Sequence, residues 1–136
     1  MNQNEFDQLV AEQEEAVTKR VNQVGGVPLK VSGEDLTGLD LRAADWMRAE
    51  ARGTIFRQAL MQGVQAERIE APGAIFVGVK AAGANFYDSN LNGTDWTDAD
   101  LPGSNLRMSR RQGAIFKDAR TDGAKIDQPP EMELAS

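Results

Sequence analysis

The sequence predicts an all-β solenoid, a rod of stacked coils, and three observations carry this prediction. Large, mostly apolar residues recur at every fifth position from Leu36 to Ile126. A smaller residue, most often alanine, serine or threonine, stands two positions before nearly all of them. Glycines recur at every tenth position from Gly53 to Gly123. Neither helices nor plain strands have a period of five residues, and self-similarity at a short fixed period is typical of solenoids.

The repeated unit is clearest in residues 74–78, 84–88, 94–98 and 99–103, which read AIFVG, ANFYD, TDWTD and ADLPG. These units resemble the pentapeptide-repeat family, whose motif is A(D/N)LXX. The resemblance extends over some nineteen consecutive units, about two thirds of the chain. It implies a right-handed, four-sided β-helix of about four to five coils, with four pentapeptides in each coil. It also implies that the central residue and the small residue two before it face inward, while the other three positions face water.

With twenty residues in a coil, every fourth unit stands in one column along the axis. One column is rich in aromatic residues: Leu36, Phe56, Phe76, Trp96 and Phe116. Smaller residues in the other columns offset these large ones, as the constant volume of a packed interior requires. The glycines fall at alternate corners, where turns need a positive φ.

Arg111 breaks the pattern, because it occupies an interior position of its column. A buried, unpaired charge is costly. We therefore expect either that its guanidinium escapes outward through a local distortion or that the register slips at this residue.

The N-terminal part of the chain differs from the repeats. Residues 4–24 place apolar side chains at three- and four-residue spacing among charged ones, which predicts an amphipathic helix. Gly25 and Gly26 would end it. The open first coil of a solenoid needs a cover, so we expect the helix to cap it, although a membrane or a partner could use the same stripe. The residues expected to face the coil are Phe6, Val10, Val17 and Val21.

The C-terminal residues predict a tail rather than another coil. Residues 127–136 contain Pro129 and Pro130 and three acids, which indicates an extended or flexible end. No helix comparable to the N-terminal one is expected there, so end-to-end dimerisation through the last coil is a further expectation. The expected organisation is a capping helix in residues 1–26, a β-helix in residues 27–126 and a flexible tail in residues 127–136.

Composition argues against catalysis. The 136 residues include no histidine and no cysteine, which removes the usual general base, the thiol nucleophile and the common soft metal ligands. A regular solenoid also offers no cleft that would perturb the pKa of paired carboxylates. We therefore expect a protein that is not an enzyme and has no cofactor.

Neither a metal site nor a membrane segment is expected. Residues 88–93 match the opening of a calcium loop, but Ala99 stands where the bidentate glutamate is needed and Leu91 belongs to the interior, so no metal is expected. No apolar run is long enough to cross a bilayer and no signal peptide is visible. The default expectation is therefore a cytoplasmic protein without a membrane partner.

Charge limits the choice of partner. Some pentapeptide-repeat proteins resemble DNA in shape and negative charge, bind bacterial DNA gyrase and protect it from quinolones. The net charge of this chain is −6, but residues 34–126 carry 13 acids and 12 bases, so the expected rod is nearly neutral and its field is weak. One stretch, residues 81–106, has four aspartates and no base: Asp88, Asp95, Asp98 and Asp100. Gyrase binding is the weaker alternative, and direct nucleic-acid binding is not expected because no basic stripe exists.

An apolar strip is the stronger candidate site. The outward position before the aromatic column holds isoleucine three times, and Val77 lies just after it, where polar residues are usual. Such a strip often marks an interaction surface, although coverage by the N-terminal helix and pairing of two rods are equal alternatives. The predicted function is a bacterial scaffold or adaptor that binds a protein partner, with an accessory role in a secretion or toxin locus as another alternative. The predicted contact residues are Ile55, Ile75, Val77 and Ile115.

Overall fold

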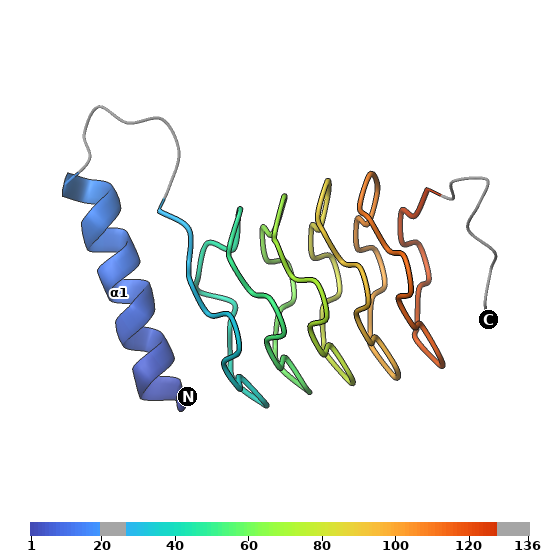
Figure 1. Ribbon diagram of the computed structural model, residues 1–136, viewed down its shortest axis with the longest axis horizontal. Coiled ribbons are helices and arrows are strands. Elements are labelled where there is room, and N and C mark those ends of the chain that lie inside the picture. The colour runs from blue at the N-terminus through green and yellow to red at the C-terminus, as the bar shows by residue number, and fades with distance from the viewer. Residues whose placement is uncertain (20–26, 128–136) are drawn as a thin grey trace.

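A computed structural model describes residues 1–19 and 27–127, with only the backbone described for residues 16–19. The described part contains one helix, α1 (Gln3–Lys19), and a stack of coils that begins beside it (Figure 1). Within this part, no helix is long and apolar enough to cross a bilayer.

The β-structure of the coils consists of single-residue parallel bridges. Each bridge joins a residue to the residue twenty positions further on, from Lys30↔Glu50 to Asn105↔Lys125. The bridged residues lie five apart along the chain, so each coil has four bridged sides and the stack contains between four and five coils. This architecture is a β-solenoid, as the five-residue period predicts.

Regular backbone hydrogen bonds fix the register between coils. In a representative pair, the Phe56 N–H donates to the carbonyl of Ile75 at 2.7 Å, and the Ile75 N–H donates to the carbonyl of Thr54 at 2.9 Å. The same pattern recurs on each side of the rod. Backbone groups on the flat sides are therefore satisfied by neighbouring coils, as a buried or half-buried sheet requires.

The predicted aromatic column runs through the interior. Ring centroids lie 4.6 Å apart between Phe56 and Phe76, 4.0 Å between Phe76 and Trp96, and 5.9 Å between Trp96 and Phe116, with interplanar angles of 7° or less. Phe86, from another side, meets Phe76 and Trp96 edge to face. These are favourable geometries for aromatic pairs, so the column gives the rod a continuous, rigid axis.

Small inward positions complete the interior. The hydroxyls among them are buried and hydrogen-bonded: Thr94 Oγ1 donates to the carbonyl of Leu91 at 2.6 Å and accepts from Trp96 Nε1 at 2.8 Å. Ile69 is a large residue in the inward series that holds mostly small residues, and it is fully buried. Its neighbours along the chain in the large series are Ala66 and Ala71, so volume is conserved across the coil.

The corners fall into two kinds. Glycines occupy the predicted corners with φ between +63° and +76°, including Gly53 and Gly113. The corners between them also adopt positive φ, but most of these carry ordinary side chains. The residues concerned are Arg48, Gln58, Arg68, Asp88, Asp98, Met108 and Asp118. Sequence reasoning missed this second set, because residues with a Cβ pay for the left-handed conformation and glycine is its usual signal.

Both expectations for Arg111 are wrong. Its side chain stays inside, with 4% of the residue exposed, and the bridge Asn90↔Arg110 shows that the register does not slip. The guanidinium donates to the carbonyl of Leu106 at 2.6 Å and to Ser109 Oγ at 2.5 Å. It also donates to the carbonyl of Asp127 and lies 3.2 Å from its carboxylate. The charge is tolerated because it is paired and hydrogen-bonded.

The helix α1 lies across the first coil (Figure 1). It begins one residue before the predicted start and is described as far as Lys19. Phe6 and Val10 are buried, and the Phe6 ring stacks on Trp46 with centroids 5.7 Å apart. The side chain of Val17 and all of Val21 lie outside the described residues, as do residues 128–136 of the predicted tail.

Candidate interaction faces

The predicted apolar strip lies on one side of the rod. Bridges join Asp35↔Ile55, Ile55↔Ile75, Ile75↔Asp95 and Asp95↔Ile115, so these residues form one outward column. We call this column and the adjoining Val77 the isoleucine face. Ile55, Ile75 and Val77 are half-buried, while 50% of Ile115 is exposed.

Asp95 interrupts the isoleucine face. It stands between Ile75 and Ile115, and its carboxylate accepts hydrogen bonds from the N–H and hydroxyl of Thr97. Ile55 and Ile75 are therefore neighbours in adjacent coils. Ile115 lies two coils beyond Ile75, with Asp95 between them.

The other three sides of the rod are polar. One column holds Glu70, Asn90 and Arg110, joined by a hydrogen bond of 3.3 Å and an ion pair of 3.6 Å. Another holds Lys80, Asp100 and Arg120, with 3.1 Å between the last two charged groups. A third holds the amides of residues 65, 85 and 105. Apart from Leu60, apolar side chains in bridged outward columns are confined to the isoleucine face.

The structure does not bring the four predicted acidic residues together. Asp95 and Asp100 lie on different sides, Asp98 lies at the corner between these sides, and Asp88 lies at another corner. Asp88 is paired with Arg68 at 3.2 Å, and Asp100 with Arg120 at 3.1 Å. The second candidate site is therefore dispersed, and two of its carboxylates are engaged by arginines.

One corner carries exposed apolar side chains that sequence reasoning missed. Met47 and Tyr87 are 42% and 41% exposed, and they occupy the same corner position two coils apart. One coil after Tyr87 the equivalent position is Arg107, and Met108, the residue after it at the same corner, is 60% exposed. The available signal was the forty-residue spacing of Met47 and Tyr87, the positions after Trp46 and Phe86, which equals two coils. Charged residues also occupy this corner: Glu67 and Arg107 alternate with Met47 and Tyr87, and Arg68 and Asp88 stand at the position that Met108 holds in the last coil.

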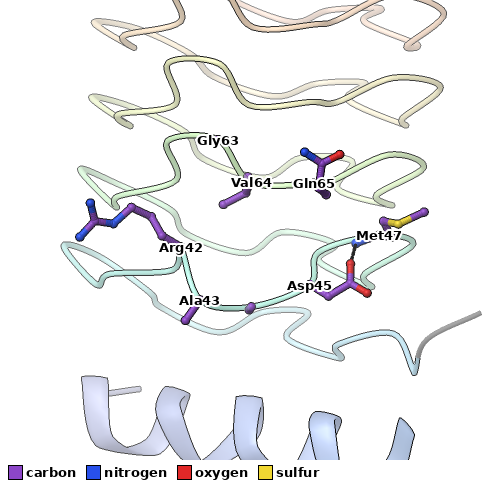
Figure 2. A pocket seen from close by; sticks show the side chains of 8 residues that line it. Arg42, Ala43, Asp45, Met47, Gly63, Val64 and Gln65 are labelled. Carbon is purple, nitrogen blue, oxygen red and sulfur yellow. Dashed lines mark hydrogen bonds between the residues drawn. The ribbon is translucent and has the colours of Figure 1, made fainter.

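A depression of about 450 Å³ lies beside the first coil, where its path is irregular (Figure 2). The bridge from position 45 to Gln65 is absent here, although Gln65 continues the column with Asn85. Asp45 instead accepts the N–H of Met47 with its carboxylate at 3.0 Å, and its carbonyl accepts Gln13 Nε2 at 3.1 Å. The depression lies between the first coil and Gly63, Val64 and Gln65 of the next coil, on the side of the first coil away from α1.

Side chains of α1 reach the edge of the first coil. Gln3 Nε2 donates to the carbonyl of Asp40 at 2.9 Å, and its Oε1 accepts the Asp40 N–H at 2.8 Å. Gln13 Nε2 donates to the carbonyl of Val27 at 2.6 Å as well as to Asp45. The terminal amine of Met1 donates to the carbonyl of Asp35 at 3.2 Å. Peptide groups that would face a preceding coil are thus bonded by side chains of α1 and by the terminal amine of Met1.

Two carboxyl groups of the first coil have lowered pKa values. The side chain and backbone N–H of Arg42 donate to Asp40, which lowers the pKa of this carboxyl to about 2. Hydrogen bonds from the hydroxyl and N–H of Thr37 lower the pKa of Asp35. Both carboxylates serve local turns, and within the described residues no group of three carboxylates is arranged to hold a metal ion.

Residues 74–118 match the family model described as pentapeptide repeats, in eight copies. The match lies within the coils that have the five-residue register, the inward columns and the bridges between coils. Residues 74–118 are therefore pentapeptide repeats.

Solved structures of pentapeptide-repeat proteins resemble the chain. The protein Rfr23 from the cyanobacterium Cyanothece 51142 is 20% identical, with a TM-score of 0.45 over 79% of this chain and 65% of its own. HetL from Nostoc sp. strain PCC 7120, involved in heterocyst differentiation regulation, is 19% identical, with a TM-score of 0.31 over 70% of this chain and 60% of its own. The fluoroquinolone resistance protein QnrB1 is 14% identical, with a TM-score of 0.29 over 72% of this chain and 77% of its own. The chain thus spans less than two thirds of the lengths of Rfr23 and HetL. No curated protein matched the chain.

Proposed function

We propose that the chain is a non-enzymatic scaffold that binds a protein partner through the isoleucine face. The observation that supports this most directly is the 50% exposure of Ile115 in the same outward column as Ile55 and Ile75. Outward apolar side chains add little to the packing of their own coil and raise the risk of aggregation. A contact with another protein accounts for them.

The chemistry of the surrounding surface fits such a contact. The isoleucine face has an apolar centre in Ile55, Ile75 and Val77, while the neighbouring sides carry charged ladders and amides. An apolar centre with a polar rim is the usual anatomy of a protein interface. The stacked rings beneath the face hold it rigid, which lowers the entropy lost on binding.

We propose also that α1 caps the β-helix, which we expect to be right-handed as in the pentapeptide-repeat family. The side-chain bonds of Gln3 and Gln13 to edge peptide groups support this role, because an uncovered sheet edge is a template for aggregation. In the described residues, α1 contacts the end of the rod and does not lie along the isoleucine face. The face therefore stays accessible.

The alternative of a DNA-mimicking gyrase binder rests on the coil of residues 87–106, which has four acids and no base. Two of these acids are paired with arginines. The next twenty residues carry six bases and two acids, so the negative band does not continue along the rod. A duplex-like field needs a continuous band of one sign, so we prefer the scaffold.

The proposal is tested by changing the isoleucine face without changing the coil. The double variant Ile75→Asp, Ile115→Asp introduces the residue that already stands at positions 35 and 95 of this column. The matched control, Asn85→Asp with Asn105→Asp, adds the same charge on another side. Asn85 and Asn105 accept turn N–H groups with their side-chain oxygens, as an aspartate also does.

Proteins captured by each variant from host lysate are compared by quantitative mass spectrometry. We expect at least one protein that the wild type and the control retain equally and that the isoleucine variant loses by about tenfold or more. Equal capture by all three forms would remove the isoleucine face as the binding site.

A further inference from the structure

The last described coil exposes its interior at the end of the rod. Phe116, Ala119 and Ile126 are only partly buried. Their equivalents one coil earlier, Trp96, Ala99 and Leu106, have exposures of 0% or 1%. Phe116 ends the aromatic column, and among the described residues only Trp96 stacks on its ring. We call this surface the distal end.

The distal end is ringed by positive charge. Residues 107–126 contain six bases and two acids, a net charge of +4. Arg111 is directed inward to Asp127, but Arg107, Lys117 and Lys125 are exposed. No described residue forms an ion pair with Lys117 or Lys125. The surface therefore combines an apolar centre with unneutralised cations on its rim.

The opposite end of the same rod shows what fits such a surface. There an aromatic ring of α1, Phe6, stacks on Trp46 with an interplanar angle of 9°, and glutamine amides bond the edge peptide groups. The exposed side of α1 is acidic. Its five acids are Glu5, Asp7, Glu12, Glu14 and Glu15.

We propose that the distal end is a docking site for an acidic amphipathic helix of a partner protein. The apolar stripe of the helix would pack on Phe116 and Ile126, and its carboxylates would meet Lys117 and Lys125. Complementary charge favours this partner over a neutral one. Ile115 of the isoleucine face lies in the same coil, but Phe116, Lys117, Lys125 and Ile126 are not part of that face, so variants at these positions test the distal end independently.

The geometry favours a helix over an extended strand. Each side of the coil offers a single bridged residue before the chain turns a corner, so a straight strand would pair with one side only. A helix spans the whole opening, as α1 does at the first coil (Figure 1). Charge also disfavours a second copy in the expected end-to-end dimer, because residues 107–127 carry a net charge of +3 and two such ends would repel each other.

A helical peptide with the sequence of residues 1–19 is a suitable probe, because it is acidic and its apolar stripe fits the end of a coil. Asn4 and Gln8 lie exposed on α1, one turn apart, so a cross-link between these positions holds the short peptide helical without touching its stripe. The peptide carries a fluorophore and is titrated with the full chain at low ionic strength, with anisotropy as the readout.

The proposal predicts saturable binding that the double variant Lys117→Glu, Lys125→Glu weakens by about tenfold or more. The control Lys30→Glu, Lys80→Glu makes the same charge change on other parts of the rod and should leave affinity within about twofold. Phe116→Ser should weaken binding at high salt as well, because its contribution is apolar. Unchanged thermal unfolding of the two lysine variants shows that the fold is intact.

Three results would overturn the proposal. The first is no saturable binding by the wild type, or equal weakening in the control. The second is binding that appears only after Met132→Ser and Leu134→Ser, since the chain's own C-terminal residues would then be the occupant. The third is a dimer in light scattering that Phe116→Ser dissociates, since a second copy would then cover the distal end.

Discussion

The side chain of Gln3 pairs with both peptide groups of Asp40. Its Nε2 donates to the carbonyl at 2.9 Å, and its Oε1 accepts the N–H at 2.8 Å. One side-chain amide of the helix thus makes the two hydrogen bonds that two residues of a preceding coil would make, as Thr54 and Phe56 do for Ile75. This relationship explains how a helix can end a parallel β-stack without leaving edge groups unbonded.

If α1 caps the first coil, replacing three of its glutamines by alanine should change the free energy of unfolding by different amounts. Gln13→Ala should lower the free energy of unfolding by about 1–3 kcal/mol, because it leaves the carbonyls of Val27 and Asp45 without their donor in a partly buried place. Gln3→Ala should cost about 1 kcal/mol for the same reason. Urea denaturation measures both values.

Gln8→Ala is the matched control, because Gln8 bonds only Glu12 on the exposed side of the same helix. All three changes carry the same gain in helix propensity. The cap would be refuted if all three variants unfolded at the same urea concentration.

The interior column should dominate stability. Phe76→Ala removes a ring stacked on both sides, at 4.6 Å from Phe56 and 4.0 Å from Trp96, and should cost about 3–5 kcal/mol. Thr97→Ala, on the outside of the same coil, should cost less than about 1 kcal/mol. Similar losses at both positions in denaturant melts would show that the assigned inward and outward positions are wrong.

The corners give a test of backbone strain. Met108 has a φ of 62° and is 60% exposed, so Met108→Gly should relieve strain and raise stability by up to about 1 kcal/mol. Gly103→Ala should have the opposite effect, because φ is 68° although a Cβ there would meet no atom within 4 Å. Thermal melts that rank the two variants in the reverse order would argue against these turn conformations.

The period of five was sufficient to predict the stack, its inward columns and the glycine corners. It could not predict how Arg111 is buried, because its partners at Leu106, Ser109 and Asp127 are brought together only by the turn of the coil. Motif-based reasoning also passed over Ile69, a large residue in the mostly small inward series. Its fit depends on alanines at neighbouring inward positions, which is a property of the packed coil and not of a single unit.

The candidate site was predictable only in part. The presence of three isoleucines and two aspartates in one outward column follows from spacing alone. The five-residue register also places the aspartates of residues 88–100 on two sides and two corners. The pairing of Asp88 with Arg68, in contrast, depends on side-chain positions in neighbouring coils. A run of acids in sequence is therefore not a patch when the chain turns a corner every five residues.

Asp127 should make stability depend on pH. The Met108 N–H donates to its carboxylate, and Arg111 lies beside it, so the pKa of Asp127 is lowered from 3.8 in the folded chain. A lowered pKa stabilises the folded state above the unfolded pKa, and this contribution is lost as the pH falls below about 4 and through the folded pKa. Asp127→Asn should lower stability at neutral pH and lose less than the wild type on acidification.

The control for this titration is Asp122→Asn, at an exposed corner of the same coil. Urea midpoints are compared at neutral pH and at about pH 3. An equal drop for the wild type and Asp127→Asn would show that this carboxylate is not held in the folded chain as described.

Site-specific photo-crosslinking tests the proposed binding face most directly. A benzophenone amino acid replaces Ile75 or Ile115 in one set of variants, and Asn85 or Asn105 in the control set, in cells that make the protein. We predict that one protein species forms adducts from positions 75 and 115 and not from positions 85 and 105. Adducts with the same species from the control positions alone, or equally from all four, would contradict binding through the isoleucine face.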